Sequence, residues 1–324
     1  MKILVTGGLG YIGSNIVLNL LKKKHQVLVV DNLANSKRST VKKILKLANT
    51  NFKFVYSDCK NKKKIFKIFN SFKPSLVIHL AGLKSVADSV KNPNLYFTEN
   101  FLSAENIFLA MQKFKVKKLI FSSSATVYGK PKCLPIDENH PTKPLHAYGA
   151  SKLAIEHLLK NICSMRIDWS VVSLRYFNPV GSDQSGLLKD NPLKPTNLFP
   201  KIFNVYKGKS SFLPLYGNNY STKDGSAIRD YIHILDLVDS HIVSINFLKK
   251  KKGFKVFNVG TGKGYSVLEI IKTFERVNRT KINFKIKSRR SGDIPICYAS
   301  VKKINKEIGW YSKLKINQMC VLKK

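Results

Sequence analysis

The chain has 324 residues, 44% of them hydrophobic, which is enough for one large domain or two ordinary ones with a sizeable core. Its 57 Lys and Arg residues against 19 Asp and Glu residues give a formal net charge of +38. The lysines are spread over the whole length, arginine is scarce, and no aromatic residues alternate with the basic runs, which argues against a specific nucleic-acid partner.

The cysteines and the apolar runs argue against other classes of protein. Five cysteines without a CxxC pair form neither a disulfide framework nor a metal site, so we expect a cytoplasmic protein without a bound metal. No apolar run reaches the length of a membrane span, and we expect no membrane partner. The N-terminus leads directly into an apolar strand, so no signal peptide is expected.

The first half of the chain alternates short apolar strands with helical segments. Continuous Val, Ile and Leu runs are typical of a parallel sheet that is covered on both faces. Repeated strand–helix units of this kind predict an α/β fold of the Rossmann type, with a doubly wound parallel sheet. The strands are expected at residues 2–8, 25–32, 52–58, 76–82, 118–124 and 169–178, with helices between them that include 12–24 and 93–114.

The alternation ends near residue 178, where long segments rich in Pro, Gly and Asn begin. Such segments are typical of functional loops. We therefore expect a dinucleotide-binding Rossmann domain over residues 1–177. Residues 178–324 would mainly form a smaller C-terminal substrate-binding lobe, with some segments returning to the Rossmann sheet.

The segment "VTGGLGYIGSN" follows the first predicted strand and opens the first helix. Gly7, Gly10 and Gly13 are three residues apart, and Gly8-x-Gly10-x-x-Gly13 fits the dinucleotide fingerprint. Glycines allow the tight turn and the close approach of backbone N–H groups to a pyrophosphate at the helix N-terminus. Asp31, eighteen positions after Gly13, would accept hydrogen bonds from both ribose hydroxyls and repel a 2′-phosphate, which predicts NAD rather than NADP.

Two basic residues leave the preference for NAD over NADP open, and the role of a second carboxylate is open as well. Lys37 and Arg38 lie close to Asp31 in the sequence and could weaken the preference for NAD. Asp58 ends the third predicted strand, where its carboxylate could contact the adenine or cap a turn.

A Tyr-x-x-x-Lys pair occurs five times, and in a helix this spacing places both side chains on one face. Only Tyr148/Lys152 follows the fifth strand and opens a helix with an apolar stripe. Ser124 ends the preceding strand, at the edge where ligand sites of α/β proteins form. The other pairs lie in a strand, before a proline or far beyond the sheet: Tyr56/Lys60, Tyr128/Lys132, Tyr298/Lys302 and Tyr311/Lys315.

These side chains suit hydride transfer between a secondary alcohol and a nicotinamide, which needs a base for the hydroxyl proton. The pKa of a free tyrosine, about 10, is too high for that role. A lysine cation about 6 Å away contributes roughly 2.8 kcal/mol at an effective dielectric constant of about 20, which lowers the phenol pKa by about two units. A positive nicotinamide would lower it further. The sequence therefore predicts Tyr148 as the base, with Lys152 and Ser124 as its partners.

The motifs together resemble, in order and over nearly the whole chain, those of the UDP-glucose 4-epimerase (UDP-galactose 4-epimerase) family in the extended short-chain dehydrogenase/reductase superfamily. They are "VTGGLGYIGSN", "DNLANSKRS", "VIHLAGLKSV", "FSSSATVYG", "YGASK", "LRYFNPVG", "RDYIHILDL" and "RRSGDIP". The resemblance implies that bound NAD takes hydride from C4 of a UDP-hexose and returns it to the opposite face. Tyr148 would be base and then acid, Lys152 would also hold the nicotinamide ribose, and Ser124 would bind the reacting hydroxyl. A homodimer is implied as well.

The resemblance also implies further contacts, residue by residue. Besides Gly7, Gly10 and Gly13, NAD contacts are expected at Tyr11, Ile12, Asp31, Asn32, Asn35, Ser36, Asp58, Cys59, Leu80, Ala81, Gly82, Lys84 and Phe177. Contacts with the sugar nucleotide are expected at Asn178, Asn197, Leu198, Tyr216, Arg229, Arg290, Asp293 and Cys297. The two arginines could clamp the diphosphate with bidentate hydrogen bonds, and Tyr216 offers an aromatic face beside the uracil.

Cys297 matches a family position beside the C2 substituent of the sugar, which holds either a tyrosine or a small residue. A cysteine leaves space for an acetamido group that would otherwise be overpacked. The resemblance therefore implies UDP-GlcNAc and UDP-GalNAc as further substrates, unless the neighbouring Tyr298 swings in to close the site.

The chain departs from the epimerase motifs at one position beside the cofactor, and two alternative functions have to be weighed against epimerisation. Glu99 stands where the family usually has an asparagine beside the cofactor, and a carboxylate there could weaken NAD binding or adjust to the nicotinamide charge. Sugar-nucleotide dehydratases carry Asp and Glu just after the strand-end Ser or Thr, where this chain has Ala125 and Thr126, so elimination lacks its acid and base. A non-catalytic NAD-binding regulator is disfavoured by the intact Tyr148 and Lys152.

Overall fold

The computed structural model describes residues 1–190, 192, 195–290 and 292–322, and the chain divides into two compact units. The first unit comprises Met1–Gly129, Pro141–Arg175 and Val238–Phe257, and the second comprises Lys130–His140, Tyr176–Leu237 and Asn258–Lys324. Residues 238–257 thus belong with the first half of the chain, and residues 130–140 belong with the second. The binding of cofactor by residues 1–177 and of substrate by residues 178–324 remains a prediction.

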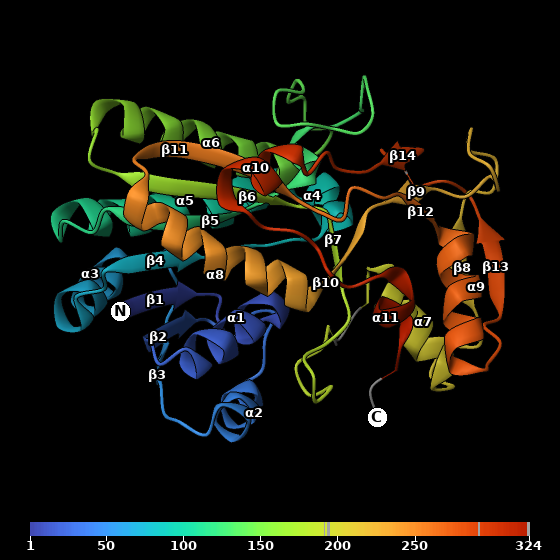
Figure 1. Cartoon of the computed structure of the whole chain (residues 1–324), viewed down its shortest axis with the longest axis horizontal. Helices are drawn as coiled ribbons and strands as arrows, with labels where there is room; N and C mark the ends of the chain where they lie inside the picture. The colour runs from blue at the N-terminus through green and yellow to red at the C-terminus, as the bar shows by residue number, and fades with distance from the viewer. Residues whose placement is uncertain (191, 193–194, 291, 323–324) are drawn as a thin grey trace. The chain divides into compact units, whose positions relative to one another are not determined.

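A seven-stranded sheet forms the centre of the first unit (Figure 1), in the order β11-β6-β5-β4-β1-β2-β3. The pairs from β3 through β5 are parallel, which confirms the predicted Rossmann-type sheet. Its strands are β1 (Lys2–Thr6), β2 (Gln26–Asp31), β3 (Lys53–Tyr56), β4 (Leu76–His79), β5 (Lys118–Ser124), β6 (Ser170–Tyr176) and β11 (Gly253–Val259). The helices are α1 (Tyr11–Lys22), α2 (Ser39–Ala48), α3 (Lys62–Phe72), α4 (Val86–Lys91), α5 (Pro93–Lys113), α6 (Ala147–Met165) and α8 (Ile234–Lys250), with a 3-10 turn, η1, at Ala125–Val127.

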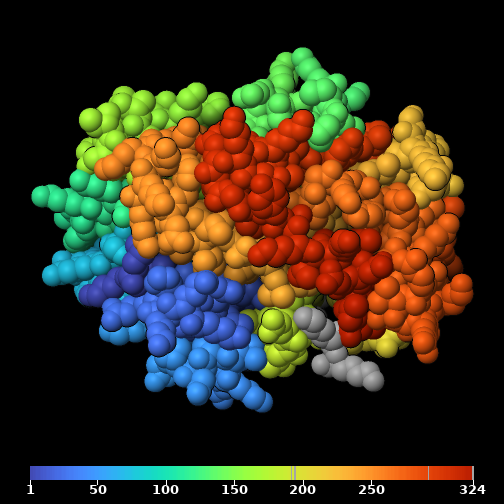
Figure 2. All heavy atoms as spheres, in the orientation of Figure 1, coloured from blue at the N-terminus to red at the C-terminus, as the bar shows by residue number. Residues whose placement is uncertain are grey.

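Amphipathic helices cover both faces of this sheet. On α3 the buried residues Ile65, Ile68, Phe69 and Phe72 recur at helical spacing, so they form one apolar face. This face packs with α5 and α6 into one buried cluster on the sheet. The opposite face carries α1 and α8 (Figure 1), whose blue and orange side chains adjoin in Figure 2. The sheet is therefore buried on both sides, as its continuous apolar strands predict.

The strand order reverses at β1, which pairs with β2 on one side and with β4 on the other. The chain winds outward in opposite directions from this point, so the loops after β1 and β4 leave the sheet at its carboxyl edge on either side of a crevice. Dinucleotides bind at such a switch point in doubly wound sheets. The fold therefore places the glycine loop and residues 80–82 together.

Smaller sheets and helices build the second unit around a separate core. Its strand pairs are β10-β7, β12-β9-β14 and β13-β8, and its core contains Phe199, Ile202, Ile271, Phe274 and Met319. The strands are β7 (Asn178–Val180), β8 (Leu213–Tyr216), β9 (Ile228–Arg229), β10 (Tyr231–His233), β12 (Tyr265–Ser266), β13 (Phe284–Lys287) and β14 (Ile296–Cys297). The helices are α7 (Leu198–Tyr206), α9 (Val267–Asn278), α10 (Lys302–Ile308) and α11 (Ile316–Cys320). Among the described residues, no helix is both long and apolar enough to cross a membrane.

A buried ion pair joins α6 to β6 in the first unit. The Glu156 carboxylate accepts hydrogen bonds from Arg175 Nη2 at 2.6 Å and Nε at 3.1 Å, and from the Ser173 hydroxyl at 2.9 Å. The Arg175 guanidinium also lies 4.7 Å from the centroid of the Tyr128 ring. Both charged side chains are almost fully buried, so each depends on the other for compensation of its charge.

We expect Glu156→Ala to lower the free energy of unfolding by about 3–5 kcal/mol, because it leaves a buried guanidinium without its counter-charge. Urea unfolding monitored by circular dichroism measures the change. Lys160→Ala on the exposed side of the same helix is the matched control and should stay within about 0.5 kcal/mol of the parent. Equal stability of the two variants would show that the pair does not hold α6 on the sheet.

Candidate functional site

The glycine loop after β1 forms a cradle that leaves no room for side chains. Gly7 has φ +68°, and a Cβ there would lie 2.8 Å from the Ala81 backbone N. A Cβ on Gly13 would lie 2.2 Å from the Gly7 carbonyl O. No side chain caps α1 at Gly10, so the positive end of the helix dipole faces the loop. Tyr11 and Ile12 open this helix, and the cradle fits a dinucleotide pyrophosphate.

Asp31 ties this loop to the one after β2. Its Oδ2 accepts the Leu9 N–H at 3.0 Å, and its Oδ1 accepts the Leu33 N–H at 2.9 Å and the Ser36 hydroxyl at 2.8 Å. A carboxylate has about four lone-pair sites, so one remains for a ribose hydroxyl. Ser36 therefore acts by orienting Asp31. Asn35, also expected at the cofactor, lies exposed in the same loop.

The loop after β3 supplies the next predicted residues. Asn32 Nδ2 donates to Asp58 Oδ2 at 3.2 Å, and Asp58 Oδ1 accepts the Lys60 N–H at 2.8 Å, so the turn-capping role of Asp58 is present. Cys59 is buried, and burial raises the pKa of its thiol to about 12. The thiol of Cys59 therefore stays protonated in the neutral pH range.

The loop after β4 borders the crevice on its other side. The Leu80 and Ala81 N–H groups donate to the Thr6 hydroxyl at 3.3 and 3.4 Å. Asn100 Oδ1 accepts the Leu83 N–H at 2.7 Å and thereby holds the turn at Gly82. Lys84 follows with an exposed side chain. Most of the predicted cofactor residues thus lie on the loops that follow β1, β2, β3 and β4 in the first unit, whereas Phe177 lies in the second unit, where its N–H donates to Val259 O at 3.1 Å.

The predicted catalytic residues meet at the end of β5. A Cβ on Gly149 would lie 2.6 Å from the Thr126 carbonyl O, so the absence of a side chain lets the first turn of α6 approach η1. This approach brings Tyr148 into hydrogen-bond contact with Ser124. Lys152 Nζ donates to the Ser122 carbonyl at 2.8 Å and lies 5.0 Å from the centroid of the Phe121 ring.

Burial opposes the ionisation of this pair. The pKa of Tyr148 lies above its ordinary value because the phenol is buried, although the hydrogen bond with Ser124 acts in the opposite direction. Burial also lowers the pKa of Lys152 to about 8, while Glu156 one turn further along α6 acts to raise it. The phenol pKa expected from charge alone was therefore too low, because the cost of burying a phenolate was omitted.

Two neighbours of Tyr148, His146 and Tyr96, and a contact of Asn100 with α6 are not among the residues predicted for the site. The His146 ring stacks on the Tyr148 ring at 6.2 Å, and His146 Nδ1 accepts the Gly149 N–H at 3.2 Å as the N-cap of α6. The Tyr96 ring meets Tyr148 edge-on at 6.4 Å. Asn100 Nδ2 donates to the Ser151 hydroxyl at 3.0 Å, which links the crevice to α6. His146 was detectable as the residue before the helix, but nothing local in the sequence indicates Tyr96.

Two arginines and an aspartate form a cluster in the second unit. Asp293 accepts from Arg229 Nη2 at 2.5 Å and from Arg290 Nη2 at 3.2 Å, so one carboxylate holds both guanidinium groups. Arg290 also lies 4.8 Å from the centroid of the Tyr216 ring, and Lys201 Nζ lies 4.9 Å from it. Four predicted substrate residues are thereby brought together, and Lys201 joins them. Two cations already contact the aromatic ring that was expected to face a uracil.

The remaining predicted substrate residues lie at the starts of elements. Asn197 is the N-cap residue of α7 and donates through Nδ2 to Asp190 Oδ2 at 3.1 Å, and Leu198 is the first residue of the helix. Asn178 opens β7, where its N–H donates to the Asp230 carbonyl at 3.0 Å. Helix α7 connects Asn197 and Leu198 to the arginine cluster, because Lys201 on this helix contacts the Tyr216 ring and the Lys201 N–H donates to the Asn197 carbonyl at 3.4 Å.

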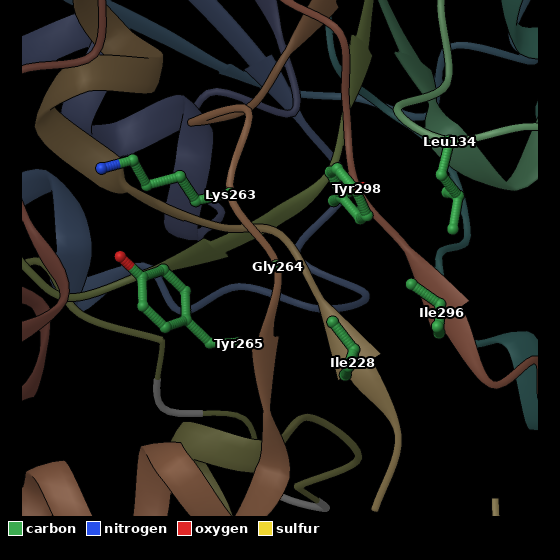
Figure 3. Close-up of a pocket in the computed structure, with 7 residues that line it drawn as sticks. All are labelled: Leu134, Ile228, Lys263, Gly264, Tyr265, Ile296 and Tyr298. Atoms are coloured by element: carbon green, nitrogen blue, oxygen red, sulfur yellow. The ribbon is translucent and has the colours of Figure 1, made fainter. Parts of the chain in front are cut away.

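Cys297 ends strand β14 of a small sheet, and Tyr298 directly follows this strand. Cys297 is buried and pairs in register with Arg229, and burial raises the pKa of its thiol to about 11. Successive strand residues point to opposite faces. Tyr298 accordingly borders an open pocket of about 530 Å³ with Ile228 and Ile296 (Figure 3). In this arrangement Tyr298 does not close the face that carries Cys297.

Comparisons with known proteins agree with these features over nearly the whole chain. A family model described as GDP-mannose 4,6 dehydratase matches residues 4–322. The UDP-glucose 4-epimerase of Yersinia enterocolitica is 46% identical, over 97% of this chain and 93% of its own length. The structure of UDP-glucose 4-epimerase from Bifidobacterium longum in complex with NAD+ and UDP has 42% identity and a TM-score of 0.95, covering 99% of this chain and 96% of its own.

A second solved structure, the UDP-Glc/GlcNAc 4-epimerase from Campylobacter jejuni, has 32% identity and a TM-score of 0.85 and covers 98% of this chain and 96% of its own. The family model has a dehydratase name, but Ala125 and Thr126 stand where dehydratases carry an acid and a base. The relatives with high identity over nearly the whole chain are epimerases, and they distinguish the epimerase branch of the superfamily from the dehydratase branch. The chain therefore belongs to the UDP-glucose 4-epimerase family of the extended short-chain dehydrogenase/reductase superfamily.

Proposed function

We propose that this enzyme interconverts UDP-glucose and UDP-galactose, using bound NAD and the Tyr148–Lys152–Ser124 group as its catalytic machinery. The observation that carries the proposal is the position of this group at the carboxyl edge of the sheet that also holds the glycine cradle. When bound, NAD would supply the acceptor and then the donor for the hydride that is exchanged with C4 of the hexose. The cofactor is NAD, because the solved structure from Bifidobacterium longum contains NAD+ and the glycine cradle of this chain suits a dinucleotide pyrophosphate.

Tyr148 Oη takes the proton of the 4-hydroxyl during oxidation and gives it back during reduction. Because burial raises the pKa of this phenol, it holds its proton firmly in the resting site and needs a nearby positive charge to act as a base. The Lys152 ammonium supplies such a charge from the same face of α6. The Ser124 hydroxyl hydrogen-bonds the phenol and orients it toward the reacting oxygen.

The arginine cluster of the second unit is the proposed site for the diphosphate of the sugar nucleotide. Arg229 and Arg290 carry guanidinium forks that match phosphate oxygens. Asp293 keeps the two groups apart and oriented before a ligand arrives. Asn178, Asn197, Leu198 and Tyr216 are proposed to complete the substrate contacts. The cytoplasmic location expected from the cysteines stays a prediction.

Tyr148→Phe is expected to lower kcat by more than about 100-fold while the amount of bound NAD stays unchanged, because only the proton-transferring oxygen is lost. A coupled UDP-galactose assay measures kcat, and absorbance of the cofactor released by denaturation measures NAD. Tyr311→Phe, an exposed tyrosine that also precedes a lysine by four residues, should keep full activity. Full activity of the Tyr148 variant would remove Tyr148 as the base.

We further propose that UDP-GlcNAc and UDP-GalNAc are substrates, because Cys297 is small and Tyr298 faces away from it. Cys297→Tyr should reduce turnover of the N-acetyl pair by about 5- to 150-fold and keep turnover of the hexose pair, since overpacking costs about 1–3 kcal/mol. Assays of both substrate pairs measure this, and Cys133→Tyr at an exposed position is the control. Absence of N-acetyl turnover in the parent enzyme would refute the wider specificity.

We also propose that the enzyme is a homodimer joined through α5. Leu95, Leu102 and Leu109 are seven residues apart on this helix and form one stripe, and the first two are 49% and 37% exposed. Such a stripe is typical of helices that pack against a second copy. Leu102→Glu should shift the sedimentation mass from about twice 36.7 kDa to that of one chain. Ile286 is an exposed apolar residue in β13, and the control variant Ile286→Glu should leave the mass unchanged. An unchanged mass for Leu102→Glu would contradict a dimer joined through α5.

A further inference from the structure

An ion pair joins the loop after β3 to α5 at the edge of the cofactor crevice. Lys60 Nζ contacts Glu99 Oε1 in a direct hydrogen bond and lies 3.9 Å from Asp58 Oδ2. Asn32 donates to the same Asp58 oxygen. The Lys60 ammonium thus links the loop after β3 to α5 through Asp58 and Glu99. Asp58 in turn connects to the loop after β2 through Asn32.

The position of Glu99 would be unfavourable for a dinucleotide if the carboxylate stood alone. The next residue, Asn100, bonds both the N–H and the carbonyl of Leu83 beside the crevice. The shared contact with Lys60 places the Glu99 carboxylate beside Asp58, in the loop after β3 at the carboxyl edge of the sheet. This is the edge at which a dinucleotide with its negatively charged diphosphate binds in such folds. Two carboxylates at this edge would repel that diphosphate, and Lys60 is the cation that contacts both of them.

We propose that Lys60 and Glu99 form a cofactor-retention pair, in which Lys60 neutralises Glu99 and so permits NAD to bind beside it. The inference rests on the NAD-dependent function proposed above. Both side chains keep partial solvent contact, 30% for Lys60 and 23% for Glu99, and exposed pairs of this kind contribute little to folding stability. The pair thus acts on the affinity for the cofactor, because a Glu99 carboxylate without Lys60 would repel the diphosphate of NAD.

The pair also explains how the chain accommodates a carboxylate at position 99. The hydrogen bond with Glu99 raises the pKa of Lys60, so the ammonium stays charged through the neutral range. Loss of Lys60 alone leaves the negative charge of Glu99 uncompensated. If Glu99 is lost as well, that charge is absent and Lys60 is no longer required to neutralise it. The two residues should therefore be coupled in NAD binding, and a double-mutant cycle isolates that coupling.

The test measures NAD+ binding to cofactor-free enzyme by isothermal titration calorimetry, with thermal unfolding of the same samples without NAD+. Lys60→Met should raise the Kd for NAD+ at least tenfold and leave the unfolding midpoint almost unchanged. Glu99→Gln alone should bind NAD+ at least as tightly as the parent. The double variant Lys60→Met/Glu99→Gln should return to within about threefold of the parent. Lys63→Met, an exposed lysine on α3, is the matched control and should not change the Kd.

Each outcome bears on the proposal. Unchanged binding by Lys60→Met overturns it, and so does a double variant that binds as weakly as Lys60→Met, because Lys60 would then act on the cofactor without Glu99. Weaker binding by Glu99→Gln alone also overturns it. If Lys60→Met proves unstable without NAD+, Lys60→Gln provides a second variant at the same position. Failure of the parent enzyme to bind NAD+ would instead refute the proposed function.

Discussion

The approach of two backbone loops at the switch point of the sheet is the constraint on which the site depends. Because a Cβ on Gly7 would lie 2.8 Å from the Ala81 nitrogen, the loops after β1 and β4 can meet only if residue 7 lacks a side chain. Asp31 fixes the other side of the glycine loop by accepting the Leu9 N–H. The crevice is therefore shaped by backbone packing before any cofactor arrives, which is the preorganisation that dinucleotide binding requires.

Helix α6 connects this crevice to the chemistry and to the core. One of its faces presents Tyr148 and Lys152 to the carboxyl edge, and a turn later Glu156 is buried against Arg175. The ion pair and the close contact of Gly149 with Thr126 both fix the position of the helix on the sheet. The charge of Glu156 acts to raise the pKa of Lys152, so the buried ion pair also favours the charged form of the lysine that we propose to be catalytic.

The sheet and the glycine cradle could be predicted from the sequence, because both follow from local spacing and strand order. The choice of Tyr148 among five similar pairs agrees with its contact with Ser124, and its role as the base stays a prediction. The sequence does not predict the direction in which the Tyr148 pKa moves, because burial is a property of the packed site. The contact of Tyr96 with Tyr148 and the two cations on the Tyr216 ring were likewise invisible, since they join residues distant in sequence. The face occupied by Tyr298 required the strand register, which spacing alone does not supply.

Local compensation explains how so basic a chain can use carboxylates at sites for anionic ligands. A net charge of +38 raises attraction to any polyanion, but it cannot orient a diphosphate. Orientation needs fixed donors, and here carboxylates fix them: Asp31 holds the glycine loop, and Asp293 holds two arginines. Each of these carboxylates accepts hydrogen bonds from N–H groups or cations of the chain itself, which compensate its negative charge. At the two proposed ligand sites, the acidic residues thus position N–H and guanidinium groups, which the lysines spread over the surface do not do.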